Sequence, residues 1–267
     1  MNKIPKVLTI AGSDSGGGAG IQADLKTLSA LGVFGTTVIT AITAQNTKEV
    51  TAIHNVPLDI ISKQISAVLS DIGADAIKIG MLSNSDIIKT VAYSLRKHNV
   101  RKIVIDPVMV SASGARLLEE SAIKSLKEYL FPMAIIVTPN ILEAEMLVGV
   151  KIDEQEDVIK AGQEILRIGC NAVLMKGGHL NYEKNKVIDI FLQNGKHLII
   201  ENKRISKSAH GTGCTLSSAI TAYIAKGLSL KSAVRNGITY THSALEHGFK
   251  VGEVNYVLAH FWSRNID

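Results

Sequence analysis

The feature that most constrains the fold is a regular alternation between short, mainly apolar runs and longer amphipathic segments. Runs that are apolar throughout are typical of strands buried on both faces of a parallel sheet. They span residues 7–11, 36–43, 76–79, 102–105, 134–138 and 172–175. Between them lie helical patterns at 21–31, 57–70, 85–98, 121–129, 141–148 and 154–168. This order predicts βαβ units in an α/β fold, a three-layer α/β/α sandwich with a mostly parallel, doubly wound sheet.

In the last third of the chain the alternation gives way to a different pattern. Asn194-Gly195 is typical of the two-residue turn of a β-hairpin. The expected elements are hairpin strands at 187–192 and 197–205, and helices at 215–225, 230–247 and 254–263. Because no internal repeat, low-complexity tract or linker interrupts the sequence, residues 1–267 are expected to form a single domain.

Composition narrows the class of function. With 46% hydrophobic and 20% charged residues, the chain is an ordinary globular protein and not a disordered one. The net charge of +5, without any basic run, suits small anionic ligands better than nucleic acid. No apolar run is long enough for a signal peptide or a membrane span. Cys170 and Cys214 form no disulfide framework or metal knuckle, so a cytoplasmic location is expected.

A glycine-rich loop, residues 12–20, follows the first predicted strand. Ligands bind at the carboxyl ends of strands in open α/β sheets, and glycines allow close backbone approach, so this loop is a candidate ligand site. Residues 18–23 match the loose dinucleotide pattern G-x-G-x-x-A, but no carboxylate follows the second strand to hold a ribose hydroxyl. Asp24, four positions past Gly20, is expected to reach a ligand in the loop. A glycine turn without a ligand is the alternative.

A second glycine loop, residues 210–214, precedes an apolar helix. Unpaired backbone N–H groups and the helix dipole make such a loop an anion site. Cys214 at the helix N-terminus is expected to have a lowered pKa, and so to be reactive or basic near neutral pH. The alternative is a small buried core cysteine.

Polar residues follow three further strands. Asn140 and Glu143 fit a helix capping box, and alternatively Glu143 holds a hydrated Mg²⁺ beside phosphates. Asp106 ends another strand and places a second carboxylate at the same sheet edge. Lys176, with two glycines after it, suits a nucleotide phosphate, or else is a solvated lysine.

Taken together, these motifs resemble the ribokinase-like superfamily, and within it the hydroxymethylpyrimidine/phosphomethylpyrimidine kinase family of thiamine biosynthesis. The resembling blocks lie at residues 9–27, 38–41, 44–47, 78–82, 106–109, 138–143, 174–179 and 210–214. The resemblance implies a ribokinase-like kinase that uses ATP and Mg²⁺. It would phosphorylate 4-amino-5-hydroxymethyl-2-methylpyrimidine and then its monophosphate. A pyridoxal/pyridoxine kinase of the same fold is the alternative.

The resemblance also implies roles for single residues. Gly211 and Gly213 shape the nest that stabilises the transferring phosphoryl group. Cys214 stands where many superfamily members carry an aspartate, and is the expected general base. The substrate is expected to contact Gly12, Asp24, Gln45, Met81 and Val108, ATP to contact Asn140, Lys176, His210 and Thr212, and Mg²⁺ to be organised by Asp106 and Glu143.

A homo-oligomer, with a dimer favoured, is expected. Residues 251–255 depart from the Gly-x-Gly-Pro-x-x-His segment that family members often carry. A nicotinamide-dependent oxidoreductase and a non-catalytic nucleotide sensor are the competing classes. Against the oxidoreductase, the chain has no acidic residue after the second strand to hold a ribose hydroxyl. A nucleotide sensor would need no base at position 214.

Overall fold

The computed structural model describes residues 3–110, 114, 117–179 and 185–263. Within these ranges nine strands form one sheet in the order β3-β2-β1-β4-β5-β6-β7-β8-β9. The strands are β1 (Lys6–Asp14), β2 (Phe34–Gln45), β3 (Val50–Asn55), β4 (Ala76–Ile79), β5 (Ile103–Ile105), β6 (Ala134–Val137), β7 (Ala172–Met175), β8 (Lys186–Gln193) and β9 (Lys196–Lys203). Strands β3, β8 and β9 are antiparallel to their neighbours and the others are parallel.

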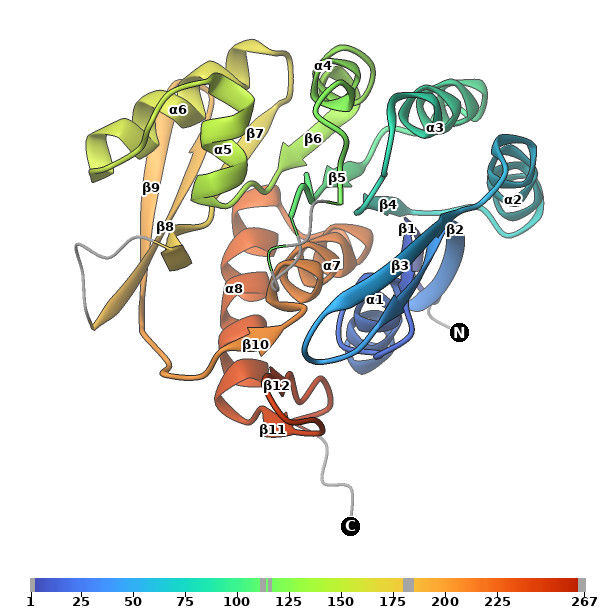
Figure 1. Cartoon of the computed structure of the whole chain (residues 1–267). Helices are drawn as coiled ribbons and strands as arrows, with labels where there is room; N and C mark the ends of the chain where they lie inside the picture. The colour runs from blue at the N-terminus through green and yellow to red at the C-terminus, as the bar shows by residue number, and fades with distance from the viewer. Residues whose placement is uncertain (1–2, 111–113, 115–116, 180–184, 264–267) are drawn as a thin grey trace.

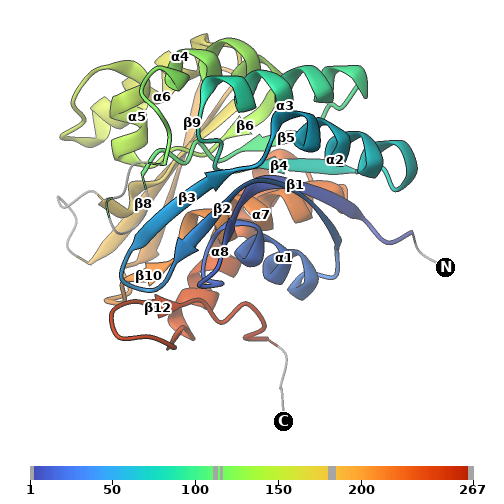
Figure 2. The ribbon, with the colours of Figure 1, turned by 45° about the vertical axis from the view of Figure 1, so that its right-hand side comes forward.

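Helices cover both faces of the sheet, which confirms the predicted three-layer α/β/α arrangement (Figure 1; Figure 2). One layer packs α2 (Leu58–Asp71), α3 (Ser85–Lys97), α4 (Ala122–Ser125), α5 (Ile141–Val148) and α6 (Gln155–Arg167) on one face. The other layer packs α1 (Gly20–Ala30), α7 (Thr212–Ala225) and α8 (Leu230–Glu246) on the opposite face. Each interface is a separate apolar core, and the sheet between them is buried on both sides.

Strand order fixes where a ligand can bind. The chain runs outward from β1 to β2 and the edge strand β3, then returns to place β4 on the other side of β1. This reversal is a topological switch point, where the loops after neighbouring strands diverge and leave a crevice at their carboxyl ends. The loops after β1 and β4, and those after β5, β6 and β7, therefore open toward one place.

Local signals explain several helix boundaries. Asn84 caps α3 by accepting from the backbone N–H of Ile87 at 3.0 Å. Gly149 ends α5 with a left-handed φ of 75°, a conformation in which glycine is favoured. The predicted helix 121–129 is shorter and irregular, because α4 continues as a π-helical turn (Leu126–Leu130) and a 3₁₀ turn (Phe131–Met133).

The structure differs from the predicted fold in two places. The helix expected at 254–263 is absent from that described stretch, which contains the short strand β12 (Tyr256–Val257) and turns. Strand β3 was not expected, because its residues are nearly all exposed and show neither an apolar run nor a clean alternation.

A C-terminal segment, residues 249–257, closes against the rest of the molecule; we call it the C-terminal clasp. Its strands β11 (Phe249–Lys250) and β12 form a small sheet with β10 (Ala209–His210), in which β12 is the central strand. Asn255 Nδ2 donates to the carbonyl of Thr47 at 3.0 Å, and Glu253 pairs with Lys48 at 2.6 Å. The clasp therefore joins the turn after β2 to the strand that leads into α7.

Within the described residues, no helix combines the length and the apolar character needed to cross a bilayer.

Candidate active site

A cavity of about 710 Å³ opens at the carboxyl ends of the parallel strands. Its position matches the switch point between β1 and β4. All but one of the predicted site residues line it, and they come from seven separate segments of the chain. The predicted residues in its wall are Gly12, Gln45, Met81, Asp106, Val108, Asn140, Glu143, Lys176, His210, Gly211, Thr212, Gly213 and Cys214.

Asp14 organises the first glycine loop. Its carboxylate, which is only 3% exposed, accepts the backbone N–H groups of Gly16 at 2.8 Å, Gly18 at 3.0 Å and Ala19 at 2.8 Å. Burial acts to raise the pKa of Asp14, but the hydrogen bond from His210 and the backbone donors outweigh it and hold the pKa below its usual value. The loop is thus shaped around one ionised side chain.

The second glycine loop begins α7 and touches the first. Gly211 has a φ of +84°, and a Cβ on it would lie 1.8 Å from the carbonyl oxygen of Gly18, so glycine is required there. Thr212 Oγ1 donates to the carbonyl of Ala209 at 3.1 Å. The N–H groups in the first turn of α7 precede any intrahelical acceptor and carry the positive end of the helix dipole. This loop can stabilise an anion in the cavity.

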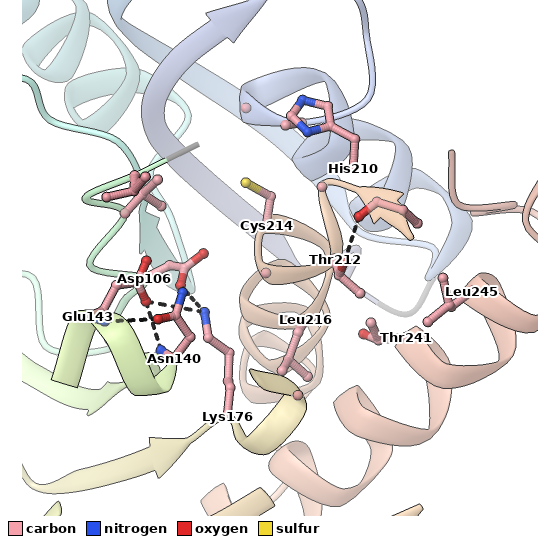
Figure 3. A pocket seen from close by; sticks show the side chains of 18 of the residues that line it. Asp106, Asn140, Glu143, Lys176, His210, Thr212, Cys214, Leu216, Thr241 and Leu245 are labelled. Carbon is pink, nitrogen blue, oxygen red and sulfur yellow. Dashed lines mark hydrogen bonds and ion pairs between the residues drawn. The ribbon is translucent and has the colours of Figure 1, made fainter. Parts of the chain in front are cut away.

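Lys176 forms the centre of a charged cluster on the opposite wall (Figure 3). Its Nζ lies 2.8 Å from Asp106 Oδ1 and 3.7 Å from Glu143 Oε2. Asn140 and Glu143 exchange both hydrogen bonds of a capping box, at 2.8 and 2.9 Å, so the predicted box is confirmed. Burial favours neutral Lys176, yet the two carboxylates raise its pKa above the ordinary value.

Asp106 and Glu143 can bind a cation only together with other ligands. Burial raises the pKa of Glu143 to about 7, against the opposing effect of Lys176. No group of three His, Cys, Asp or Glu side chains converges on a metal position among the residues described. Mg²⁺ usually keeps several waters and takes one or two carboxylates beside phosphates, and Asp106 with Glu143 fits that donor set.

The predicted low pKa of Cys214 is wrong. The residue is partly exposed at the cavity wall, but burial of its thiol raises the pKa to about 11. Lys78 opposes this shift, whereas the carboxylates of Asp24 and Asp106 add to it. Desolvation and two nearby anions therefore outweigh the helix N-terminus, and the thiol is protonated at neutral pH in the unliganded protein.

The expected contact of Asp24 with the ligand is also wrong. Asp24 is fully buried and is not part of the cavity wall. Its carboxylate oxygens lie 2.9 and 3.0 Å from Lys78 Nζ, and they accept from Thr9 Oγ1 at 2.6 Å and Ser218 Oγ at 2.7 Å. Both carboxylate oxygens therefore bind side chains of β1, β4 and α7. Asp24 fixes Lys78 below the cavity and does not contact a ligand.

His210 lies beside Gln45 and not beside the Lys176 cluster. The distance between His210 Nε2 and Gln45 Nε2 is 2.6 Å, and Asp14 Oδ2 lies 3.3 Å from the same imidazole nitrogen. In Figure 3 the imidazole stands on the far side of Cys214 from Lys176. This placement does not support the expected contact of His210 with ATP and links it to the predicted ring-binding side chain.

Part of the cavity wall was not predicted. Lys78 reaches it from β4 and Asp189 from β8, where Asp189 accepts the backbone N–H of Gly177 at 2.9 Å. Another part is formed by residues 202–205 and 207–209, from the end of β9 to the start of β10, and by Ile238, Thr241, His242 and Leu245 on α8. The spacing of the α8 residues is visible in the sequence, but such a stripe is typical of a core-facing helix.

Comparison with known proteins identifies relatives. The family model described as phosphomethylpyrimidine kinase matches residues 14–259. A thiamine biosynthesis bifunctional protein of Geobacter sulfurreducens is 45% identical over 258 residues, which cover 95% of this chain and 52% of that longer protein. A hydroxymethylpyrimidine/phosphomethylpyrimidine kinase of Rhizobium meliloti is 46% identical over 258 residues, 95% of this chain and 96% of that one.

Solved structures agree with the sequence comparison. Pyridoxal kinase from Staphylococcus aureus in complex with ADP superimposes with a TM-score of 0.90 at 35% identity, covering 100% of this chain and 97% of that one. Phosphomethylpyrimidine kinase from Clostridium difficile gives a TM-score of 0.80 at 49% identity, covering 91% of this chain and 99% of that one. The predicted ribokinase-like fold is confirmed, and this chain belongs to the phosphomethylpyrimidine kinase family.

Proposed function

We propose that this chain transfers a phosphoryl group from ATP to 4-amino-5-hydroxymethyl-2-methylpyrimidine, and then to its monophosphate, in thiamine diphosphate biosynthesis. One observation carries the proposal. A thiol (Cys214), an anion-binding helix N-terminus and a lysine–carboxylate cluster (Lys176) line the same cavity as the amide of Gln45. The relatives from Rhizobium meliloti and Geobacter sulfurreducens carry names of the same activity and pathway.

Cys214 is the proposed proton acceptor. The oxygen of the substrate hydroxymethyl group attacks the γ-phosphorus of ATP, the bond to the β-phosphate oxygen breaks, and the hydroxyl proton passes to the thiolate. Lys78 and Lys176 are both close enough to favour the thiolate electrostatically. Because the thiol has a pKa of about 11, the base must be formed by losing a proton before each turnover.

Charge on the transferring group is balanced by the chain's own donors. The N–H groups of residues 212–214 supply the nest, and Lys176 supplies a cation whose charge is held by Asp106 and Glu143. Asp106 and Glu143 would also hold Mg²⁺ through water, and the ion supplies further neutralisation of phosphate charge. The α8 face at Ile238, Thr241 and Leu245 gives an apolar wall that suits the nucleotide base.

A second candidate function is pyridoxal phosphorylation. Pyridoxal kinase from Staphylococcus aureus in complex with pyridoxal has a TM-score of 0.90 and covers this whole chain at 35% identity. A coupled ADP-release assay with the pyrimidine alcohol, its monophosphate and pyridoxal separates the two, with phosphorus NMR of the products. Release of ADP that requires a pyrimidine substrate and Mg²⁺ supports the proposal. Release with pyridoxal alone would replace it with the second candidate.

We further propose that residues 1–267 act as one domain, in the cytoplasm and as a homodimer. The two cysteines are free, which suits a reducing compartment. Ile42, Ile53, Leu58 and Ile60 are between 39% and 53% exposed around β2, β3 and the start of α2, and a second copy would cover such side chains. Light scattering after size exclusion tests the dimer, and a monomer mass at micromolar concentration would refute it.

A further inference from the structure

The Nε2 atom of His210 lies near one group that can only accept a hydrogen bond and one that can only donate. His210 Nε2 lies 3.3 Å from Asp14 Oδ2, a carboxylate that only accepts hydrogen bonds. The same nitrogen lies 2.6 Å from the amide nitrogen of Gln45, which only donates. A proton on Nε2 satisfies Asp14 and opposes the amide N–H groups. A bare Nε2 accepts from Gln45 and turns its lone pair toward Asp14.

Asp14 decides between the two arrangements. Three backbone N–H groups and its burial in the first glycine loop fix the carboxylate in place. The imidazole is fixed as well, since it packs against Gly18 and its backbone belongs to β10, paired with β12. An ionised carboxylate held beside a ring nitrogen favours the tautomer with its proton on that nitrogen.

The amide of Gln45 must then present its oxygen to His210. The other end of the amide supports this orientation. Gln45 Oε1 lies 3.2 Å from Thr43 Oγ1, but that hydroxyl has one proton and donates it to the carbonyl of Ser13 at 3.0 Å, so it cannot also donate to an oxygen of Gln45. With its nitrogen turned toward Thr43, Gln45 donates to the hydroxyl while the hydroxyl donates onward. Each of these contacts then joins a donor to an acceptor, one amide N–H group and one lone pair of the amide oxygen stay available to a ligand, and the direction of a side-chain amide follows from such partners.

We propose that His210 is a positioning residue that fixes the order of donor and acceptor which Gln45 presents to the substrate ring. Asp14 sets the imidazole tautomer, the imidazole sets the amide, and the amide distinguishes rings by their hydrogen-bonding edge. The proposal rests on the proposed function, because it takes the ring to be an aminopyrimidine. His210 itself touches neither ATP nor the reacting atoms in this arrangement.

Two substitutions separate positioning from simple packing. His210→Gln places an N–H donor near the position of Nε2, whereas His210→Asn places its amide near Nδ1 and leaves Asp14 and Gln45 without it. We expect His210→Asn to lose about 10–100-fold in kcat/KM for the pyrimidine alcohol, mainly through KM. His210→Gln should stay within about threefold of the parent, and KM for ATP within about twofold in both.

Controls make each outcome decisive. His197→Asn changes an exposed histidine on β9 and should leave all parameters unchanged. Thr43→Val removes the hydroxyl on the other side of the amide and should repeat the ring-selective loss even if the His210 variants fold poorly. Equal losses in His210→Asn and His210→Gln, or a parallel rise in KM for ATP, would overturn the inference. If the parent protein phosphorylates no pyrimidine, the proposed function fails instead.

Discussion

Cys214→Ala tests the general base directly. The thiol pKa of about 11 leaves a thiolate fraction of about 10⁻⁴ at pH 7 and about 10⁻² at pH 9. If the thiolate takes the hydroxyl proton, kcat/KM of the parent should rise about tenfold per pH unit between pH 7 and 9. The Ala variant should lose about 10²–10⁴-fold in turnover at pH 9, keep its substrate affinity, and lose the rise with pH.

The second cysteine provides a matched control for this experiment. Burial also raises the pKa of Cys170 to about 11, but Cys170 is a core residue outside the cavity. Cys170→Ala should therefore keep both the turnover and the pH slope of the parent. The assay is initial-rate ADP release at several pH values, with far-UV circular dichroism to verify folding. An Ala variant at position 214 that keeps the slope would show that another group takes the proton.

Three further predictions follow from contacts in and below the cavity. Asp24→Asn leaves the buried Lys78 without its counter-ion and should lower the free energy of unfolding, measured with urea, by about 3–5 kcal/mol. A decrease below about 1 kcal/mol would contradict a tightly paired buried charge. Gly213→Val places a side chain near Lys176 Nζ, which lies 3.2 Å from where a Cβ would stand, so turnover should fall by about 10–100-fold at unchanged folded fraction. A loss that only parallels unfolding argues against the nest. Gln45→Met should lose about 10–100-fold in kcat/KM for the pyrimidine alcohol and spare any activity on pyridoxal; equal losses would mean that Gln45 shapes the loop.

Much of the fold follows from the sequence because the parallel strands are buried on both faces. Their apolar runs are unmistakable, and the alternation with helices leaves few other topologies. Strand β3 was missed for the converse reason, since an exposed edge strand carries no burial pattern. The helix expected at 254–263 does not form: within this stretch Tyr256 and Val257 pair with β10, and the residues after them form turns. Tertiary pairing there outweighs local propensity.

The candidate site could be predicted as a set of residues but not as a set of contacts. The switch point brings together side chains that follow different strands, so position in the sequence was sufficient for most of them. The pKa of Cys214 depends on Lys78, Asp24 and Asp106, which come from three other segments of the chain. Asp24 itself looked like a ligand contact because one-dimensional spacing gave no sign that Lys78 would meet it below the cavity. Electrostatic partners across a fold leave little trace in a single sequence.

The C-terminal clasp makes the site a late product of chain synthesis. The hydrogen bond between Asn255 and Thr47 joins residues 208 positions apart, and β12 holds the strand that carries His210. Contacts of such long sequence separation form only after the intervening chain has been made and ordered. Strands β1 to β7 are therefore synthesised before the residues that support the backbone of the imidazole beside Gln45. Activity is therefore expected only after residues 249–257 have been synthesised and have paired with β10, which is later than the synthesis of the sheet strands.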